Sequence, residues 1–308
     1  MRKACLEGIY ELARRDQRIL FVGSDISSSG VLERFKTEMP DRFFMEGISE
    51  GHLLSMMAGF ALCGKISYFN TIASFITRRC FEQIVLDACL HRFRIRLIGS
   101  GGGVVYAPLG PTHQVIEDIA ILRSLPHMTV LVPADADEMR RLLPQTVDYE
   151  GPIYIRLAKG GDPIVSREEF GFKIGAAYIY RPGNDVAIIT TGIMLKAALD
   201  AAQNLETHGI QAAVVHVPTV KPLDCETVIQ ACRAVRLVVT VEEHTIIGGL
   251  GSAVAEILME TEGGSAKRLI RCGFPDVFPE GYGSQALLMK KYGLDSENII
   301  RKILAVMQ

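Results

Sequence analysis

The sequence predicts an α/β protein built from two doubly wound domains, and three observations support this prediction. Short runs rich in Val and Ile alternate with segments of helical period along the chain. The alternation pauses once, over residues 158–184, where Gly, Pro and charged residues are more frequent, and it then resumes over a shorter stretch. Because strands that alternate with helices assemble into mostly parallel sheets, we expect one sheet on each side of the pause, with the boundary near residues 160–180.

Each expected domain has its own series of elements. The first domain, expected over residues 1–165, opens with an amphipathic helix in MRKACLEGIYELARRDQR. Its expected strands cover residues 18–24, 65–72, 94–100, 128–133 and 152–157, and its further helices cover 50–63, 75–92, 114–124 and 135–147. The smaller second domain is expected over residues 180–308. Its expected strands cover residues 185–192, 211–217, 236–243 and 267–274, and its helices cover 194–208, 224–233, 249–261, 283–291 and 296–306.

The composition excludes several classes of protein. The formal net charge of −2 gives no electrostatic reason to expect nucleic acid or an acidic membrane as the main partner. The seven Cys are odd in number and contain no CxxC pair, so neither a disulfide framework nor a zinc site is expected. The charged N-terminus has no apolar signal-peptide core, and no stretch approaches the roughly 18 apolar residues of a membrane span. We therefore expect a soluble protein of the reducing cytoplasm.

A glutamate stands where an expected strand gives way to a helix. In MEGISEGHLLSMMAGFALCG (45–64), Glu50 follows a short strand and a Gly turn and begins the helix. Acidic residues are common in the first turn of a helix, because they complement its dipole. Position alone therefore favours an ordinary structural role for Glu50.

Two further segments hold candidate functional residues. YFNTIASFITRRCFEQIVLDAC (68–89) contains Phe75 and Phe81, which taken singly are ordinary core residues. PLGPTHQVIEDIAILRSLPHMTVLVPAD (108–135) contains His113, and a lone His is usually structural or solvated. The functional interpretation depends on finding these segments in one order and at one spacing.

Together with the Glu50 segment, these strings resemble transketolases and deoxyxylulose-phosphate synthases. The resemblance implies a pyrimidine-binding domain followed by a transketolase C-terminal domain, which VVTVEEHTIIGGLGSAVAEIL (238–258) matches without a catalytic residue. It also implies that Glu50 contacts the aminopyrimidine of thiamine diphosphate, that Phe75 and Phe81 enclose that ring, and that His113 touches the hydroxyls of a donor sugar. The implied activity is transfer of a two-carbon ketol unit between sugar phosphates.

One element of the full-length family is absent from the sequence. Full-length transketolases hold the cofactor diphosphate and Mg²⁺ with a Gly-Asp-Gly string and a later Asn. The only Gly-Asp here, at residues 161–162, is followed by Pro163, which lacks a backbone donor. We therefore expect an N-terminal transketolase subunit to hold the diphosphate and to supply most of the Mg²⁺ coordination, in an α2β2 heterotetramer, with no metal ligand in this chain.

The resemblance also implies a set of residues around the substrate and the cofactor. It matches Arg2, Arg156 and Ser29, with Ser28 as a rival, to groups that bind substrate phosphate, and the planar fork of Arg suits phosphate oxygens. For each of these taken singly, a surface role is equally compatible with the sequence. Asp25 matches a family Asp near the cofactor, whose alternative is a turn or cap residue. Arg78, three residues after Phe75, matches a synthase Arg and is a further candidate for substrate binding.

Two positions depart from the family pattern. Leu109 stands four residues before His113, where transketolases commonly have an Asp that binds the hydroxyl next to the acceptor aldehyde. The glycine run 101–103 replaces a family His that helps to bind phosphate. Leu cannot accept a hydrogen bond, so we expect a specialised or branched sugar phosphate, such as apulose 4-phosphate.

Three alternatives remain compatible with the sequence. The first is the beta subunit of a 2-oxoacid dehydrogenase, which shares the layout and the pyrimidine Glu; the GPTHQ string and Arg156 favour the sugar enzyme. The second is a split enzyme of the deoxyxylulose-phosphate synthase type. The third is a regulatory or scaffold paralogue without catalysis, which the presence of Glu50, Phe75 and His113 disfavours.

Overall fold

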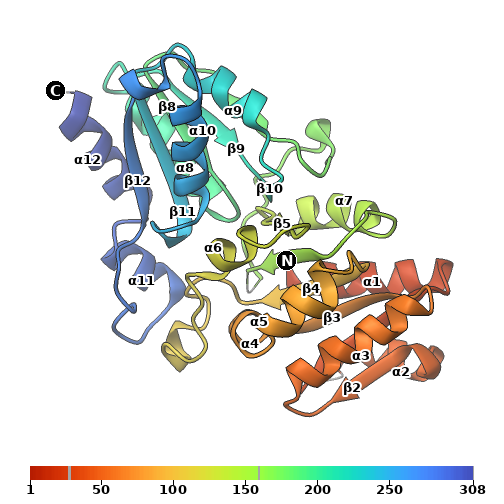
Figure 1. Cartoon of the computed structure of the whole chain (residues 1–308). Coiled ribbons are helices and arrows are strands. Elements are labelled where there is room, and N and C mark those ends of the chain that lie inside the picture. The colour runs from red at the N-terminus through yellow and green to blue at the C-terminus, as the bar shows by residue number, and fades with distance from the viewer. Residues whose placement is uncertain (27–28, 159, 308) are drawn as a thin grey trace.

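The chain folds into two α/β units, as the sequence predicts. The computed structural model describes residues 1–26, 29–158 and 160–307. Figure 1 shows the first unit at the bottom in red to green and the second above it in cyan to blue, with α6 (Asp118–Arg123) at the junction. Each unit is a sheet covered by helices on both faces, which confirms the expected fold class.

The larger sheet of the described residues has seven strands. Its spatial order is β10 (Thr219–Lys221), β5 (Thr129–Leu131), β6 (Ile153–Leu157), β4 (Ile95–Ser100), β3 (Ile66–Ile72), β1 (Ile19–Ser24) and β2 (Phe43–Glu46). All neighbours are parallel except β10, which pairs antiparallel with β5. Parallel strands covered on both faces are largely apolar, and β1, β4 and β6 are buried at every position.

Two layers of helices cover this sheet. They are α1 (Arg2–Arg15), α2 (Val31–Glu38), α3 (Glu50–Leu62), α4 (Ala73–Arg79), α5 (Phe81–Gln83), α6 and α7 (Ala136–Thr146). Side chains of β1 alternate between the two cores: Phe21 packs in one, with α1 and α7, and Val22 packs in the other, with α3 and α4. The sheet therefore has a core on each face, and its carboxyl edge is left for the loops.

The smaller sheet belongs to the second unit. Its order is β12 (Arg268–Phe274), β11 (Leu237–Thr245), β8 (Val186–Thr190), β9 (Ala212–His216) and β7 (Tyr178–Arg181), with only β7 antiparallel among these strands. The helices around it are α8 (Met194–Glu206), α9 (Cys225–Cys232), α10 (Leu250–Glu260), α11 (Gln285–Lys291) and α12 (Ser296–Met307).

The two units share a strand, which the sequence did not predict. β10 follows β9 of the small sheet in the chain, yet it joins the edge of the large sheet beside β5. Lys221, at its end, donates to the backbone carbonyls of Arg123 and Leu125. β10 has only three residues, too few for a recognisable pattern, so its partner could be found only from the tertiary structure.

The helix expected over residues 75–92 is interrupted. It begins at Ala73 as α4, ends at Arg79, and resumes after Cys80 as α5 and a π-helical turn over Ile84–Cys89. Cys80 leaves the helical region, with φ −124° and ψ 29°, and its thiol contacts the carbonyl of Ile76 at 2.8 Å. The interruption turns the end of α4, and its two arginines, toward the edge of the sheet.

Two further properties are the hydrophobicity of the helices and the burial of the cysteines. Across residues 1–26, 29–158 and 160–307, none of the helices combines the length and hydrophobicity that crossing a bilayer requires. Five of the seven cysteines are buried, and Cys63 and Cys225 are exposed.

Candidate active site

The candidate site lies at the carboxyl edge of the large sheet. The parallel strands β2, β1, β3, β4 and β6 are neighbours, so the loops that follow them meet at one edge. Ser24 ends β1, Ser100 ends β4, and Glu50 begins α3 just after β2. In open α/β sheets this edge is where ligands bind, since helix N-termini and loops converge there.

Glu50 is a buried carboxylate with two polar partners. The side chain is 3% exposed at the N-terminus of α3. The hydroxyl of Ser24, also buried, lies 3.0 Å from Oε1 of Glu50. Arg79 donates from Nη1 to both carboxylate oxygens, at 3.3 and 3.4 Å, and its own side chain is 44% exposed. A buried charge requires such partners, and here one of them is half in solvent.

Phe75 contacts both His113 and Arg79, and Arg79 in turn donates to Glu50. The guanidinium of Arg79 lies over the Phe75 ring, with Cζ 3.9 Å from the ring centroid. The His113 imidazole meets Phe75 edge-on, with 5.3 Å between centroids, and its Nδ1 is 2.8 Å from the hydroxyl of Thr112. The structure thus brings together three of the residues that the sequence singled out: Glu50, Phe75 and His113.

Arg78 is engaged with the loop that carries His113. It pairs with Glu117 at 2.6 Å and donates to the carbonyls of Pro111 and Gln114 at 3.2 and 2.9 Å. In this arrangement Arg78 holds the loop in place. Binding of a substrate phosphate by Arg78 remains a prediction, and it would require a ligand to share or replace these contacts.

Phe81 and Asp25 make no hydrogen bond or ring contact with Glu50, Phe75 or His113 among the residues that the structure describes. Phe81 begins α5 and is 37% exposed, and no ring contact joins it to Phe75 among the described residues. Asp25 follows β1 at the same edge, is exposed, and has a positive φ of 44°. Their cofactor contacts remain predictions.

The predicted phosphate-binding residues at the N-terminal side are less enclosed. Ser29 is exposed, and its rival Ser28 lies outside the described residues. Arg2 begins α1 and is partly buried, with Nε lacking a hydrogen-bond partner among the residues that the structure describes. A buried donor without a partner is compatible with the predicted role of Arg2 toward an anion.

Arg156 is buried in an ion-pair network instead of facing the surface. It is 6% exposed, and its Nε donates to Asp118 at 2.8 Å. Its Nη2 donates to the carbonyl of Glu243 at 2.8 Å. Burial opposes the charge, yet the Asp118 carboxylate and nearby Glu243 hold the pKa of Arg156 above its usual value. The predicted phosphate-binding role of Arg156 therefore meets an arrangement in which Nε and Nη2 already donate within the protein.

The glycine run 101–103 has a packing explanation. A Cβ on Gly102 would overlap the Arg156 side chain, and one on Gly103 would overlap the Glu243 carboxylate. Gly101 and Gly103 also have positive φ angles of 75° and 68°, which favour glycine. The close approach of Arg156 and Glu243 therefore excludes a side chain at residues 102 and 103.

Several residues of the site were missed at the sequence level. Arg79 is next to Arg78 in the string TRRC, and only the turn of α4 decides which of the two faces Glu50. Ser24 and Asp118 carried no signal beyond their residue type. Glu243 lies in the second domain, for which the resemblance implies no catalytic residue.

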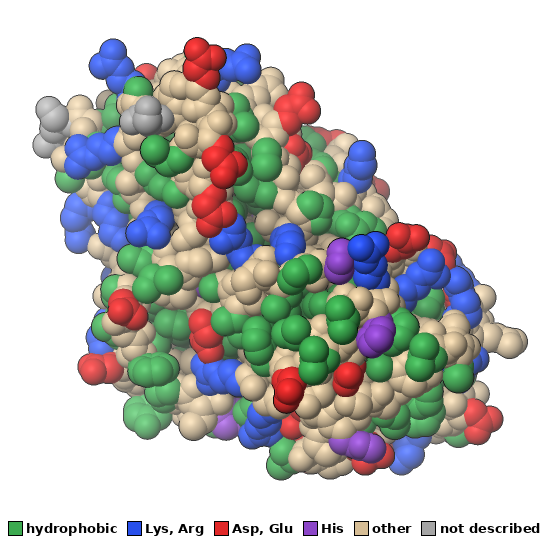
Figure 2. All heavy atoms as spheres, viewed as in Figure 1, with side chains coloured by type: hydrophobic (Ala, Val, Ile, Leu, Met, Phe, Trp, Pro, Cys, Tyr) green, Lys and Arg blue, Asp and Glu red, His purple; other side chains and the backbone are tan. Residues whose placement is uncertain are grey.

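The described residues fit a flat, hydrogen-bonding ring at Glu50. The Arg79 guanidinium already shows that a planar group can stack on Phe75 and donate to Glu50 at once. Hydrophobic side chains gather on this face of the first unit in Figure 2, over the region where Figure 1 places α3 to α5. The large exposed ones on these segments include Leu62, Phe81, Leu86 and Leu90. The surface formed by α3, α5 and the turn that follows is therefore partly apolar and exposed, which is typical of a surface that contacts another polypeptide.

Comparison with known proteins first defines the class. Residues 1–161 match the family model described as "Transketolase, pyrimidine binding domain", and residues 175–299 match "Transketolase, C-terminal domain". The sheet with Glu50 and Phe75 is therefore a pyrimidine-binding domain, and the smaller sheet is a transketolase C-terminal domain.

Relatives of nearly the same length narrow the assignment. A 6-deoxy-6-sulfo-D-fructose transketolase subunit of Clostridium sp. is 36% identical, over 98% of this chain and 92% of its own. An apulose-4-phosphate transketolase subunit of Phocaeicola vulgatus is 35% identical, over 98% of this chain and 96% of its own. A solved structure described as "Split gene transketolase, inactive beta4 tetramer" is 36% identical, with a TM-score of 0.88 over 99% of this chain and 96% of that one. The chain belongs to the transketolase family, as the C-terminal subunit of a split transketolase.

Proposed function

We propose that this subunit, together with an N-terminal transketolase subunit, transfers a two-carbon ketol unit between sugar phosphates with thiamine diphosphate and Mg²⁺. The observation that carries the proposal is the buried Glu50 carboxylate at the sheet edge, beside Phe75 and His113. When bound, thiamine diphosphate supplies the carbanion chemistry that breaks and forms C–C bonds next to a carbonyl.

The residues of this chain have separate tasks in that reaction. Glu50 would hold a proton toward the ring nitrogen of a bound aminopyrimidine. Phe75 provides the face on which the ring stacks and helps to exclude water. His113, on the loop held by Arg78, binds the donor hydroxyls and stabilises charge that develops on the carbonyl oxygen. The partner subunit holds the diphosphate and the metal, because the chain lacks the Gly-Asp-Gly string for that task.

The substrate is proposed to be a specialised or branched sugar phosphate, such as apulose 4-phosphate. Leu109 supports this choice, because it is 53% exposed four residues before His113 and offers no hydrogen bond to a hydroxyl. The named substrates of the two relatives are likewise not the common pentose phosphates. A pocket that cannot pair a substrate hydroxyl disfavours substrates that carry one there.

The test compares substrates on the assembled enzyme. The chain is co-expressed with its N-terminal subunit and supplied with thiamine diphosphate and Mg²⁺. The rate at which apulose 4-phosphate is consumed is compared with the rate at which xylulose 5-phosphate is consumed when ribose 5-phosphate is the acceptor. Faster turnover of the branched sugar supports the proposal, and ordinary rates with the pentose phosphates remove the argument from Leu109.

The same assay separates the alternatives. Release of CO₂ from pyruvate or a branched 2-oxoacid would instead indicate a 2-oxoacid dehydrogenase subunit, and CO₂ release from pyruvate with glyceraldehyde 3-phosphate would indicate a synthase. A complex that binds the cofactor but converts none of these substrates would favour a regulatory paralogue.

A further inference from the structure

Residues of the C-terminal domain contact both ends of the loop that carries His113. This loop runs from Gly103 to Val115, which form an antiparallel bridge by exchanging two backbone hydrogen bonds of 2.9 Å. His113 therefore lies near the end of a closed loop with two adjacent stems. Whatever fixes the stems also fixes where the imidazole meets Phe75.

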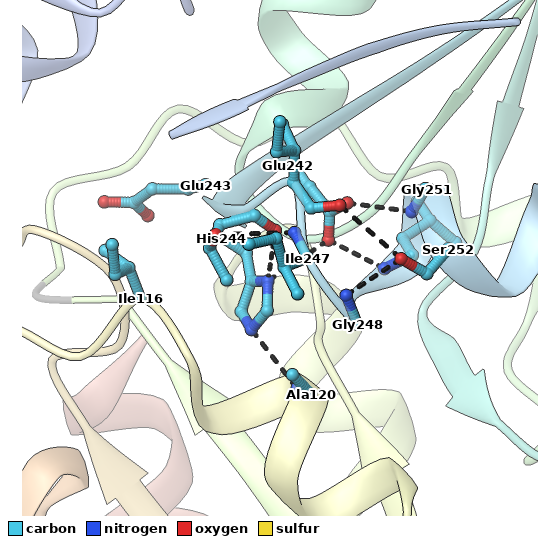
Figure 3. A network of polar contacts seen from close by, with 12 residues as sticks. Ile116, Ala120, Glu242, Glu243, His244, Ile247, Gly248, Gly251 and Ser252 are labelled. Atoms are coloured by element: carbon cyan, nitrogen blue, oxygen red, sulfur yellow. Dashed lines mark hydrogen bonds and ion pairs between the residues drawn. The ribbon is translucent and has the colours of Figure 1, made fainter. Parts of the chain in front are cut away.

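Three successive residues at the end of β11 contact the two stems and helix α6, which follows them. The Glu243 carboxylate accepts the backbone N–H of Val104 at 2.9 Å, on the incoming stem. The N–H of Thr245 donates to the carbonyl of Ile116 at 2.7 Å, on the outgoing stem. His244 accepts the N–H of Ala120 on Nε2 at 3.2 Å, while its Nδ1 donates to the carbonyl of Thr245 at 2.7 Å. Figure 3 shows His244 directed at Ala120 and Glu243 directed away from it, on the side of Ile116.

Glu243 is the charged member of this set, and it is enclosed on every side. It is 3% exposed, and Gln285 of α11 donates to the same Oε1 at 2.8 Å. The Arg156 guanidinium approaches from the large sheet and also donates to the carbonyl of Glu243. Burial raises the pKa of the Glu243 carboxyl, while Arg156 acts in the opposite direction. Burying an ionisable group costs free energy, and the hydrogen bonds from Val104 and Gln285 offset part of that cost.

From these contacts we propose that Glu243 is a positioning residue of the active site: it fixes the loop 103–115, and thereby His113, from the C-terminal domain. This inference rests on the proposed function insofar as His113 acts on substrate. The C-terminal domain then contributes to catalysis as a support for the loop, although it supplies no group to the reacting atoms. Small displacements of such a group are costly, because reacting geometry tolerates little error.

The test uses three variants of the full chain and measures amide hydrogen exchange. Glu243→Ala removes the acceptor of the Val104 N–H, and Glu243→Gln keeps an amide oxygen that can accept from both Val104 and Gln285. The matched control, Glu256→Ala, breaks a different interdomain contact, the exposed pair of this α10 residue with Arg123. We expect amides 104–115 to exchange on the order of tenfold faster in Glu243→Ala, and at nearly the wild-type rate in Glu243→Gln and Glu256→Ala.

Kinetics of the complex with its partner give the second readout. The substrate is whichever of apulose 4-phosphate and xylulose 5-phosphate the wild-type complex consumes. With that substrate, kcat/KM should fall between about tenfold and a hundredfold in Glu243→Ala. Glu243→Gln should recover most of this loss, and Glu256→Ala should show none. Should Glu243→Ala fail to fold, Gln285→Ala tests the same oxygen from the surface side, with a smaller change of the same sign.

Two results would overturn the inference. One is wild-type exchange at residues 104–115 in Glu243→Ala, and the other is an increase spread evenly over both domains, which indicates general destabilisation. If the wild-type complex consumes neither sugar, the proposed function fails, while the exchange experiment still decides whether Glu243 holds the loop.

Discussion

Two buried glutamates, Glu50 and Glu243, have the same exposure and opposite surroundings. Each is 3% exposed and each lies beside an arginine. Glu50 is covered on its outer side by Arg79, whose side chain is 44% exposed. Glu243 is enclosed between two domains, by Arg156, Gln285 and the Val104 backbone. Equal burial therefore conceals a difference: one carboxylate can be uncovered by moving a single side chain, and the other cannot.

The difference matters because the proposed function requires a ligand to reach Glu50 and not Glu243. A carboxylate that serves as a proton partner for a bound ring has to be desolvated yet reachable. One that positions a loop has to keep the same partners throughout the reaction. Arg79 stacked on Phe75 satisfies the first condition, and the interdomain network satisfies the second.

The largest effect is expected at Glu50, where removing the charge tests the reachable carboxylate. In Glu50→Gln, the amide cannot exchange a proton with a ring nitrogen, so kcat of the assembled enzyme should fall about 10²- to 10⁴-fold. The measurement is ketol transfer at saturating cofactor. Glu33→Gln, an exposed acid in the first turn of α2, serves as the control. Near-normal activity in Glu50→Gln would end the catalytic assignment.

A second effect is expected at Gly103, which lies against the enclosed carboxylate of Glu243. In Gly103→Ala, the backbone has a φ of 68° and the new Cβ would overlap the Glu243 carboxylate. We expect a loss of about 1–3 kcal/mol in the free energy of unfolding, measured by denaturant titration. Gly209→Ala is the matched control, since it has a φ of 74° and open space around its Cβ position. Equal losses in the two variants would show that the approach of Glu243 contributes nothing.

A third, smaller effect is expected at Arg79, which covers Glu50. Thiamine bound as proposed would displace the guanidinium from Phe75 and Glu50, so Arg79→Ala should bind thiamine more tightly. A half-exposed stacking and ion-pair contact of about 1 kcal/mol corresponds to roughly a fivefold change in Kd. Calorimetric titration of the isolated chain measures it, with Arg34→Ala as the control, because Arg34 is an exposed arginine over the ring of Tyr10 in α1. Weaker binding in Arg79→Ala would mean that Arg79 holds the ligand and does not merely cover the carboxylate.

The smallest effect is a pH dependence at Glu243. Its pKa is raised by burial in the folded state, so the folded protein holds this proton more tightly than the unfolded chain does. Stability then falls as pH rises from the ordinary pKa of Glu through the raised one. The effect is modest because Arg156 offsets part of the burial, while Asp118 adds to it. Unfolding free energies from pH 4 to 8 should decline for the wild type relative to Glu243→Gln, and a parallel pair of curves would contradict this.

Much of the fold and half of the site could be predicted from the sequence. Strands such as 19–24 and 153–157 are largely apolar runs, because both faces of a parallel sheet are buried. Glu50, Phe75 and His113 were found through their motifs, and the structure brings them together. By contrast, the burial of Arg156 in an ion-pair network was not predicted, because nothing near it in sequence announces Asp118 or Glu243 as its neighbours.

The sequence by itself determined the local matters: the two alternating domains, the helix that begins at Glu50, and the family to which the strings around His113 point. These follow from periodicity and from short motifs, which act over a few residues. The tertiary structure decided which arginine covers Glu50, why residues 101–103 are glycine, that β10 joins the other sheet, and that Glu243 contacts the loop of His113. Those outcomes depend on contacts between residues up to 139 positions apart, whose energies no local pattern contains.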